Sequence, residues 1–216
     1  MPADPGTSEK YQFILLRHGE SVGNAEGRIQ GLSDFPLTNY GREQARALAH
    51  RWLAEKITFD RVLSSPLARC RETAEIIAEA MNLPVEYDEV WMERDYGKLS
   101  GLTHAKAVES EGRPLYAFPY QPVGKNGESL WGLYLRGSQA LHSLMSLTPG
   151  RYLIVSHGGI LNMVMYAILG IAPQAYLRGA RFLFDNTAYA ALSYMPSEHI
   201  WRVEAINDHS HNKKSE

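Results

Sequence analysis

Short apolar runs alternate along the chain with longer stretches of helical period, and the runs predict buried strands. Residues 13–16 form one such run, which leads directly into Arg17 and His18. An apolar run of this length between polar residues is typical of a strand buried on both faces of a parallel sheet. Five further segments have the composition of strands: residues 59–65, 84–87, 151–156, 186–195 and 200–205. The last two predict an antiparallel pair at a sheet edge.

Stretches with apolar residues at helical spacing separate these strands. They cover residues 38–56, 66–81 and 128–147, and a further helix is expected to follow His157. Thr38 is a candidate N-cap, and Pro66 stands where a first-turn proline is favourable. The alternation of strands and helices predicts an α/β fold with a parallel sheet.

Two segments have the composition of site loops. Residues 89–101 combine glycines with acidic residues, and residues 102–127 are irregular, with prolines, aromatic residues and a short helix expected near 104–111. Long loops in compact domains are often functional, so 102–127 is predicted to form a lid or cap. The rest of residues 11–207 is predicted to be one domain, and the polar segments 1–10 and 208–216 are expected to be disordered.

Composition narrows the classes of function. A chain of 216 residues with 44% hydrophobic residues fits one globular domain. The net charge of -2 gives no basic excess to attract nucleic acid or an acidic membrane, so any anion site must be a local cluster. The chain has a single cysteine, Cys70, which excludes an internal disulfide and favours a reducing, cytoplasmic compartment. Cys70 itself is predicted to be a small core residue. No secretory signal or membrane-spanning run is evident.

Candidate chemistry gathers where strands end. Two predicted strands are followed by histidine and glycine, at His18 and His157, and a third leads into a helix with Arg69 in its first turn. Open α/β sheets bind ligands beyond the carboxyl ends of their strands, so these side chains and Arg17 are expected to meet. An arginine in a helix's first turn opposes the dipole unless it faces an anion, and helix N-termini bind phosphate. A phosphate site is therefore predicted.

Other chemistries fit less well. Two histidines with Glu93 could ligate zinc, but two nearby arginines would add positive charge beside a dication. Cys70 lacks the phosphate-cradling loop of a cysteine phosphatase, and Ser156 lacks the first glycine of a nucleophile elbow. Neither a Walker A motif nor a G-x-G-x-x-G fingerprint is present.

Eight blocks of sequence, in order, resemble the histidine phosphatase superfamily, in its phosphoglycerate-mutase-like branch. The longest are LRHGES at 16–21, SSPLARCRETA at 64–74, ERDYG at 93–97 and VSHGG at 155–159. Shorter ones lie at 31–38, 41–45, 127–129 and 186–187. One R-H-G alone is a weak signal, whereas this ordered set covers most of the chain and is specific.

The resemblance implies an α/β/α sandwich and a mechanism without metal or cofactor. It implies that His18 is the nucleophile and forms a phosphohistidine, and that Glu93 is the proton donor. The expected ligands of the phosphoryl group are Arg17, Asn24, Gln30, Arg69, His157 and Gly158. Histidine attacks only when neutral, and nearby cations disfavour its protonation while they stabilise the transferring phosphoryl group.

The same resemblance fits both a phosphatase and a mutase, so other features of the sequence must distinguish these two activities. Mutases of this branch carry a longer insert with paired arginines, whereas the segment after Gly101 offers only Arg113. A metal-independent phosphatase acting on a small phosphorylated metabolite is therefore preferred over a cofactor-dependent phosphoglycerate mutase. A phosphate-binding protein without activity is the third class, ranked lower because the expected catalytic residues are present. Nucleic acid and membrane partners are not expected, and a homodimer is left open.

Overall fold

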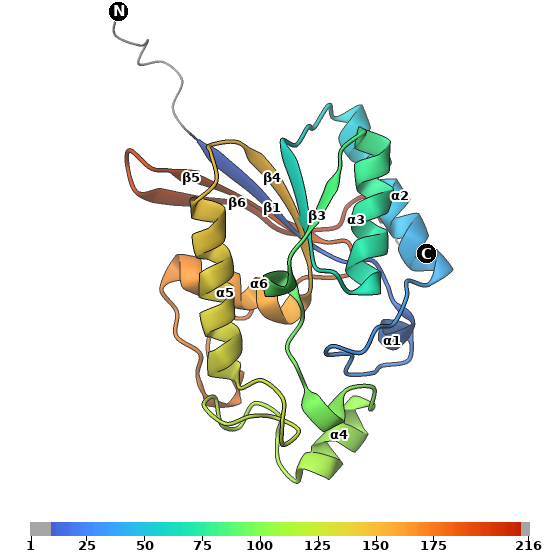
Figure 1. Cartoon of the computed structure of the whole chain (residues 1–216), viewed down its shortest axis with the longest axis vertical. Coiled ribbons are helices and arrows are strands. Elements are labelled where there is room, and N and C mark those ends of the chain that lie inside the picture. Colours follow the sequence, from blue (N-terminus) through green and yellow to red (C-terminus); the bar gives the residue numbers. More distant parts are fainter. Residues whose placement is uncertain (1–9, 213–216) are drawn as a thin grey trace, which may run out of the picture.

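The computed structural model describes residues 10–212 and has one central sheet (Figure 1). Its strands, in the spatial order β3-β2-β4-β1-β5-β6, are β1 (Tyr11–Arg17), β2 (Arg61–Ser64), β3 (Val85–Tyr87), β4 (Arg151–Ser156), β5 (Tyr189–Met195) and β6 (Ile200–Asp208). The first four strands in this order pair in parallel, while β5 is antiparallel to both β1 and β6. The mostly parallel sheet and its antiparallel edge pair are confirmed.

Helices cover both faces of the sheet, which confirms the three-layer arrangement (Figure 1). α2 (Asn39–Ala54) and α3 (Ala68–Met81) pack on one face, and α5 (Leu130–Met145) and α6 (Gly158–Leu169) on the other. Alternate residues of β4 separate the two cores: Leu153 lies with Trp52 and Ile77, whereas Ile154 lies with Leu161. Because β4 is buried on both faces, its sequence is a continuous apolar run.

The helix N-termini show which sequence signals act. Thr38 caps α2 as predicted, because its Oγ1 accepts a hydrogen bond from Gly41 N at 2.9 Å. The expected start of α3 at Pro66 is wrong, since the helix begins at Ala68 with Leu67 as N-cap. The reason is tertiary: the Asp34 carboxylate accepts a hydrogen bond from the Ala68 N–H at 2.6 Å and caps the helix from a distant loop.

The segment after β3 lies beyond one end of the sheet (Figure 1). It contains the short helix α4 (His104–Glu111), at the predicted position, and has its own small apolar cluster of Leu99, Ala107, Leu115 and Val123. The segment after β1 includes one helical turn, α1 (Val22–Ala25), which Ser21 and Asn24 close as a capping box.

The chain ends differ in part from the expected disorder. Residues 1–9 and 213–216 lie outside the described residues. Lys10 pairs with Glu204 at 3.3 Å. β6 runs to Asp208, beyond the predicted end of that strand, and residues 208–212 make hydrogen bonds to the rest of the domain, so the structure differs there from the expected tail. Within residues 10–212, no helix has the length and apolar character needed to cross a membrane.

Candidate active site

The two predicted histidines meet at the carboxyl ends of neighbouring strands. β1 and β4 pair so that Arg17 lies opposite Ser156, and the next residues are His18 and His157. The His18 N–H donates to Ser156 O at 3.0 Å, and the two imidazole rings have their centroids 5.2 Å apart in an edge-on arrangement. The register of the parallel pair therefore brings together residues that are far apart in sequence.

His18 is a buried imidazole whose orientation is fixed by a backbone carbonyl. Its ring is only 2% exposed, and its Nδ1 lies 2.7 Å from Gly19 O. A carbonyl oxygen only accepts, so Nδ1 carries the hydrogen and Nε2 keeps its lone pair. Burial, then Arg69 and Arg17, lower the pKa of His18 well below its usual value of 6.5. The predicted effect of the arginines is present, but burial is the larger cause.

Arg69 is held rigidly among loop carbonyls. It is 1% exposed and donates through Nη2 to Gly31 O at 2.8 Å, through Nη1 to Ser33 O at 3.0 Å, and through Nε to His157 Nδ1 at 3.2 Å. Burial lowers its pKa, although a guanidinium stays charged at neutral pH. A fixed, desolvated cation beside His18 is suited to an anionic phosphoryl group.

His157 is locked in one tautomer by its neighbours. Because Nδ1 accepts from Arg69, Nε2 carries the hydrogen and donates to Ser65 Oγ at 2.8 Å. The Cys70 Sγ lies 3.3 Å from the same nitrogen. Burial, together with the Arg69 charge, lowers the pKa of His157 well below 6.5, while burial raises that of the Cys70 thiol. Cys70 is thus a core residue, as predicted, and also a neighbour of the site.

Arg17 and Glu93 line a cavity of about 470 Å³, whereas His18, Arg69 and His157 are not among its lining residues. Arg17 donates through Nη1 to Phe184 O at 2.6 Å, and its buried Nε has no hydrogen-bond partner among the described residues. The Glu93 carboxylate accepts from Arg94 N at 2.8 Å and from Gly159 N, in the first turn of α6, at 3.0 Å. A side chain on Gly159 would displace this carboxylate from its position, because a Cβ there would overlap with Glu93 Oε1.

The remaining predicted ligands differ in their surroundings. Gly158 lines the cavity at the N-terminus of α6. Asn24 Oδ1 accepts from Asn186 Nδ2 at 3.2 Å and lies 2.9 Å from Ser21 Oγ. Gln30 Oε1 lies 2.8 Å from the same hydroxyl oxygen. As far as the structure describes the chain, neither Asn24 nor Gln30 lines the cavity; both brace the loop after β1.

The zinc alternative gains no support from the arrangement of side chains. Within residues 10–212, no three or more His, Cys, Asp or Glu side chains are grouped closely enough to hold a metal ion. The two imidazoles are instead committed to Gly19 O, Ser65 Oγ and Arg69.

Comparison with known proteins identifies the family of the chain. The family model described as histidine phosphatase superfamily (branch 1) matches residues 13–209. The chain belongs to the histidine phosphatase superfamily. The resemblance read from the sequence blocks is thereby confirmed.

Relatives within the superfamily carry different functional names. A protein of Salmonella choleraesuis named probable phosphoglycerate mutase GpmB is 36% identical over 207 residues, 93% of this chain and 94% of that protein. The solved structure of YhfR from Bacillus stearothermophilus has a TM-score of 0.80 at 28% identity and covers 93% of this chain and 98% of its own. Phosphoserine phosphatase from Entamoeba histolytica, solved with phosphoserine, has a TM-score of 0.78 at 25% identity and covers 94% and 100%. The expected enzyme class, a phosphatase of this superfamily, agrees with the last of these proteins and not with the name of the Salmonella relative.

Several residues of this histidine phosphatase site were not singled out in the sequence. Arg94 is buried beside Glu93, donates through Nε to Glu128 O at 3.0 Å and lies between the rings of Tyr96 and Tyr116. Its Nη1 has no partner among the described residues, and its side chain lines the cavity. Its place in the ERDYG block was a usable signal. Ser65, beside His157, had no signal in the sequence other than its place in the SSPLARCRETA block.

Protonation of the buried histidines makes stability depend on pH. Folded His18 and His157 have lowered pKa values, whereas the unfolded chain titrates near 6.5. The unfolded state binds protons first, so stability that is present above pH 6.5 is lost progressively as the pH falls below it. Each histidine adds a slope of up to about 1.4 kcal/mol per pH unit until its folded pKa is reached.

We therefore expect the free energy of unfolding, measured in urea, to fall steadily as the pH is lowered below about 6.5. The replacement His18→Gln should reduce that slope. His50→Gln, on the exposed surface of α2, is the matched control and should leave it unchanged. If the free energy of unfolding depends on pH equally in wild type and His18→Gln, the lowered pKa of folded His18 is contradicted.

Proposed function

We propose that this protein is a metal-independent phosphatase that hydrolyses a small phosphomonoester through a phosphohistidine intermediate. The observation that carries the proposal is the orientation of His18. Its Nδ1–H is committed to Gly19 O, which leaves the lone pair on Nε2, and the charges of Arg69 and Arg17 act on a ring whose centroid lies 5.2 Å from that of His157. Such an imidazole is nucleophilic and lies where phosphoryl charge is stabilised.

In the first step, His18 Nε2 attacks phosphorus, and the ester P–O bond breaks. Arg17 and Arg69, aided by the Gly158 end of α6, bind the phosphoryl oxygens. Glu93, protonated, gives its proton to the leaving alkoxide, which departs as the alcohol. The backbone N–H groups of Arg94 and Gly159 fix this carboxyl group in the cavity wall.

In the second step, water attacks the phosphohistidine. Glu93, now a carboxylate, takes a proton from that water as the N–P bond breaks, and His18 returns to its neutral state. Inorganic phosphate and the protonated Glu93 complete the cycle. Arg69 keeps its three hydrogen bonds to loop atoms and His157, so the charge in the site stays fixed throughout.

The cavity supports a substrate that carries more than its phosphoryl group. Beyond Arg17, it is lined by the cationic side chains of Arg28, Arg94 and Arg181. Arg113, the one lid arginine noted in the sequence, instead pairs with Glu111 at 3.0 Å and lies over Phe118. If the alcohol part of the substrate carries an acidic substituent, the guanidinium of Arg94 would bind it. A screen of phosphorylated metabolites would identify the preferred alcohol.

Phosphoglycerate mutase is the second candidate, favoured by the name of the Salmonella relatives. A mutase must return the phosphoryl group to phosphoglycerate, whereas a phosphatase releases it to water. Mixing the protein with labelled 3-phosphoglycerate, with and without 2,3-bisphosphoglycerate, separates the two. We expect free phosphate as the main product; 2-phosphoglycerate that forms faster than phosphate would favour the mutase.

The first test of the proposal is a rapid-mixing experiment with an aryl phosphate. An enzyme with a phosphohistidine intermediate can release a burst of the phenol before steady turnover, whereas a phosphate-binding protein releases none.

The proposed setting is the cytoplasm, in keeping with the buried free thiol of Cys70.

Chelators should not affect the reaction, because arginines and a helix N-terminus take the part that a metal ion plays elsewhere. We expect equal turnover before and after incubation with EDTA and removal of the chelator. Loss of activity that added zinc or magnesium restores would reverse this view. A zinc phosphatase assayed in parallel gives the positive control.

A further inference from the structure

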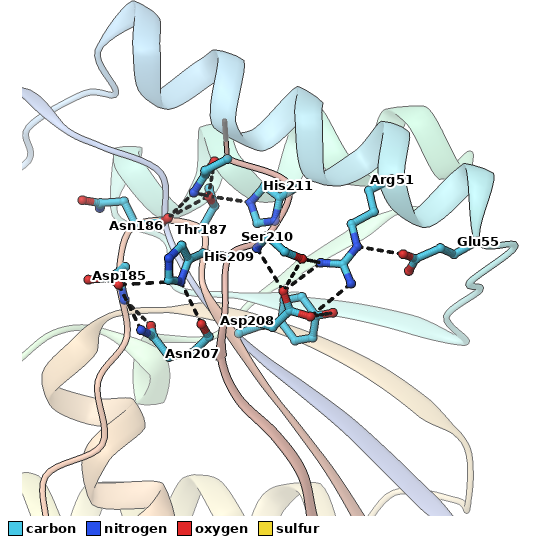
Figure 2. A network of polar contacts seen from close by, with 12 residues as sticks. Arg51, Glu55, Asp185, Asn186, Thr187, Asn207, Asp208, His209, Ser210 and His211 are labelled. Atoms are coloured by element: carbon cyan, nitrogen blue, oxygen red, sulfur yellow. Dashed lines mark hydrogen bonds and ion pairs between the residues drawn. The ribbon is translucent and has the colours of Figure 1, made fainter. Parts of the chain in front are cut away.

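The last described residues fold back against the loop that precedes β5. Figure 2 shows residues 207–211 beside residues 185–187, with polar contacts between Asp185 and Asn207 and between Thr187 and His211. This loop touches both catalytic residues at the end of β1. The inference below rests on the proposed phosphohistidine chemistry and concerns how its nucleophile is held.

The carbonyl of His18 is fixed by two donors from this loop. Thr187 N donates to His18 O at 3.2 Å, and Asn186 Nδ2 donates to the same oxygen at 3.1 Å. Three residues before Thr187, the carbonyl oxygen of Phe184 accepts a hydrogen bond from Arg17 Nη1 at 2.6 Å. Since the His18 ring is tied to the next carbonyl, that of Gly19, a shift of the backbone at His18 would move the nucleophilic nitrogen.

Thr187 holds this position in a strained conformation. Its φ is +55°, in the left-handed region that β-branched residues avoid, and its side chain is fully buried. Such strain persists only where the surrounding structure over-determines the backbone, and it concentrates at functional sites. The groups around Thr187 therefore impose its conformation.

The C-terminal turn supplies those groups. The Thr187 hydroxyl donates to Asn186 O at 2.7 Å, so its oxygen accepts from His211 Nε2 at 2.9 Å and from Asn212 Nδ2 at 3.2 Å. Asn212 Nδ2 also lies 3.2 Å from Asn186 O. Burial lowers the pKa of His211 to about 4, so its ring is neutral and donates at pH 7.

The turn is itself anchored to the body of the domain. The Asp208 carboxylate accepts from Arg51 of α2 at 2.8 and 3.1 Å and from the Tyr189 hydroxyl at 2.8 Å. Asn207 and Asp185 exchange hydrogen bonds of 2.8 and 2.9 Å. Figure 2 shows these contacts on either side of His211, so His211 and Asn212 are presented from a fixed base.

We infer that His211 and Asn212 are positioning residues for the nucleophile, acting on His18 through Thr187 and Asn186. They touch neither the cavity nor the reacting atoms. Their removal should therefore slow formation of the phosphohistidine while substrate binding stays unchanged, because the phosphate ligands Arg69 and Gly158 are held by other contacts.

The test is a double-mutant cycle on the rate of phosphohistidine formation. His211→Leu keeps the bulk and removes the donor, and Thr187→Val removes the acceptor. Each should lower the single-turnover rate constant with an aryl phosphate about tenfold, since small displacements of reacting groups are costly. The double variant should be no slower than Thr187→Val alone, because both changes break one contact. The substrate dissociation constant should stay within about threefold throughout.

Two variants control for a general effect on stability. His211→Gln places an amide N–H near the position of Nε2 and should recover most of the rate. Tyr194→Phe removes a hydrogen bond to His199 at the far end of the same β5–β6 hairpin and should react like wild type. All rates are measured at a temperature where circular dichroism shows each variant folded. If His211→Leu does not fold, Asn212→Ala takes its place in the comparison.

The outcomes separate this inference from the proposed function. A wild type that forms no phosphohistidine overturns both. A labelled wild type with an unchanged rate in folded His211→Leu overturns the positioning role alone. So do losses that multiply in the double variant, or a weakened substrate affinity that accounts for the slower rate.

Discussion

Replacing His18 with alanine is expected to abolish turnover. His18 supplies the only nucleophile that the proposed mechanism uses, and its ring is oriented by Gly19 O with Nε2 left free. Loss of a catalytic nucleophile typically lowers kcat by about 10⁴- to 10⁶-fold. The measurement is steady-state hydrolysis of an aryl phosphate together with trapping of the labelled protein after a brief reaction.

The trapped label also tests the chemistry of the intermediate. Wild type should carry phosphate that is labile in acid and stable in base, as a phosphohistidine is, and His18→Ala should carry none. His50→Ala, on the exposed face of α2, is the matched control and should be labelled like wild type. Label that survives acid would indicate a serine ester and would refute the histidine mechanism.

The parts of the site that could be predicted from sequence are those fixed by strand patterning. His18 and His157 each follow an apolar run, and buried strands of that kind become neighbours in a parallel sheet. Arg69 follows β2 in the same way, at the start of α3. Residue type and position along the strand were sufficient, because the carboxyl ends of parallel strands share one edge.

The contacts that orient these side chains could not be predicted in the same way. Arg69 is held by the carbonyls of Gly31 and Ser33, and His18 by the loop at Asn186 and Thr187. Every residue has a carbonyl and nearly every residue an N–H, so residue type does not reveal which of them will turn toward the site.

The start of α3 and the chain's end show the same limit. Pro66 is locally a favourable first residue of a helix, yet the helix begins at Ala68, whose N–H is capped by Asp34, 34 residues before it. Residues 208–212 are polar and lie near a terminus, which normally indicates disorder. Their order comes from Arg51 and Thr187, partners that sequence distance hides. The hydrogen bond between His211 and Thr187 is one of these contacts.

The Glu93→Gln variant is expected to lose activity in proportion to the need of the leaving group for a proton. General acid catalysis is typically worth about 10²- to 10⁴-fold. An alkyl alkoxide needs a proton as its bond to phosphorus breaks, whereas a nitrophenolate leaves with little help. The two oxygens of Glu93 accept separately, Oε1 from Arg94 N and Oε2 from Gly159 N, so glutamine keeps one of these hydrogen bonds through its carbonyl oxygen while the transferable proton is lost.

The decisive comparison is single-turnover phosphohistidine formation from an alkyl and an aryl phosphate. Glu93→Gln should be slowed strongly with the alkyl ester and little with the aryl ester. Asp95→Asn is the matched control, because Asp95 lies two residues away and accepts from Gly97 N at 2.7 Å within its own turn rather than lining the cavity of Arg17. It should show no dependence on the leaving group. Glu89→Gln, at the other end of the same loop, should behave likewise. Equal losses for both esters in Glu93→Gln, or a dependence on the leaving group in Asp95→Asn, would mean that another group donates the proton.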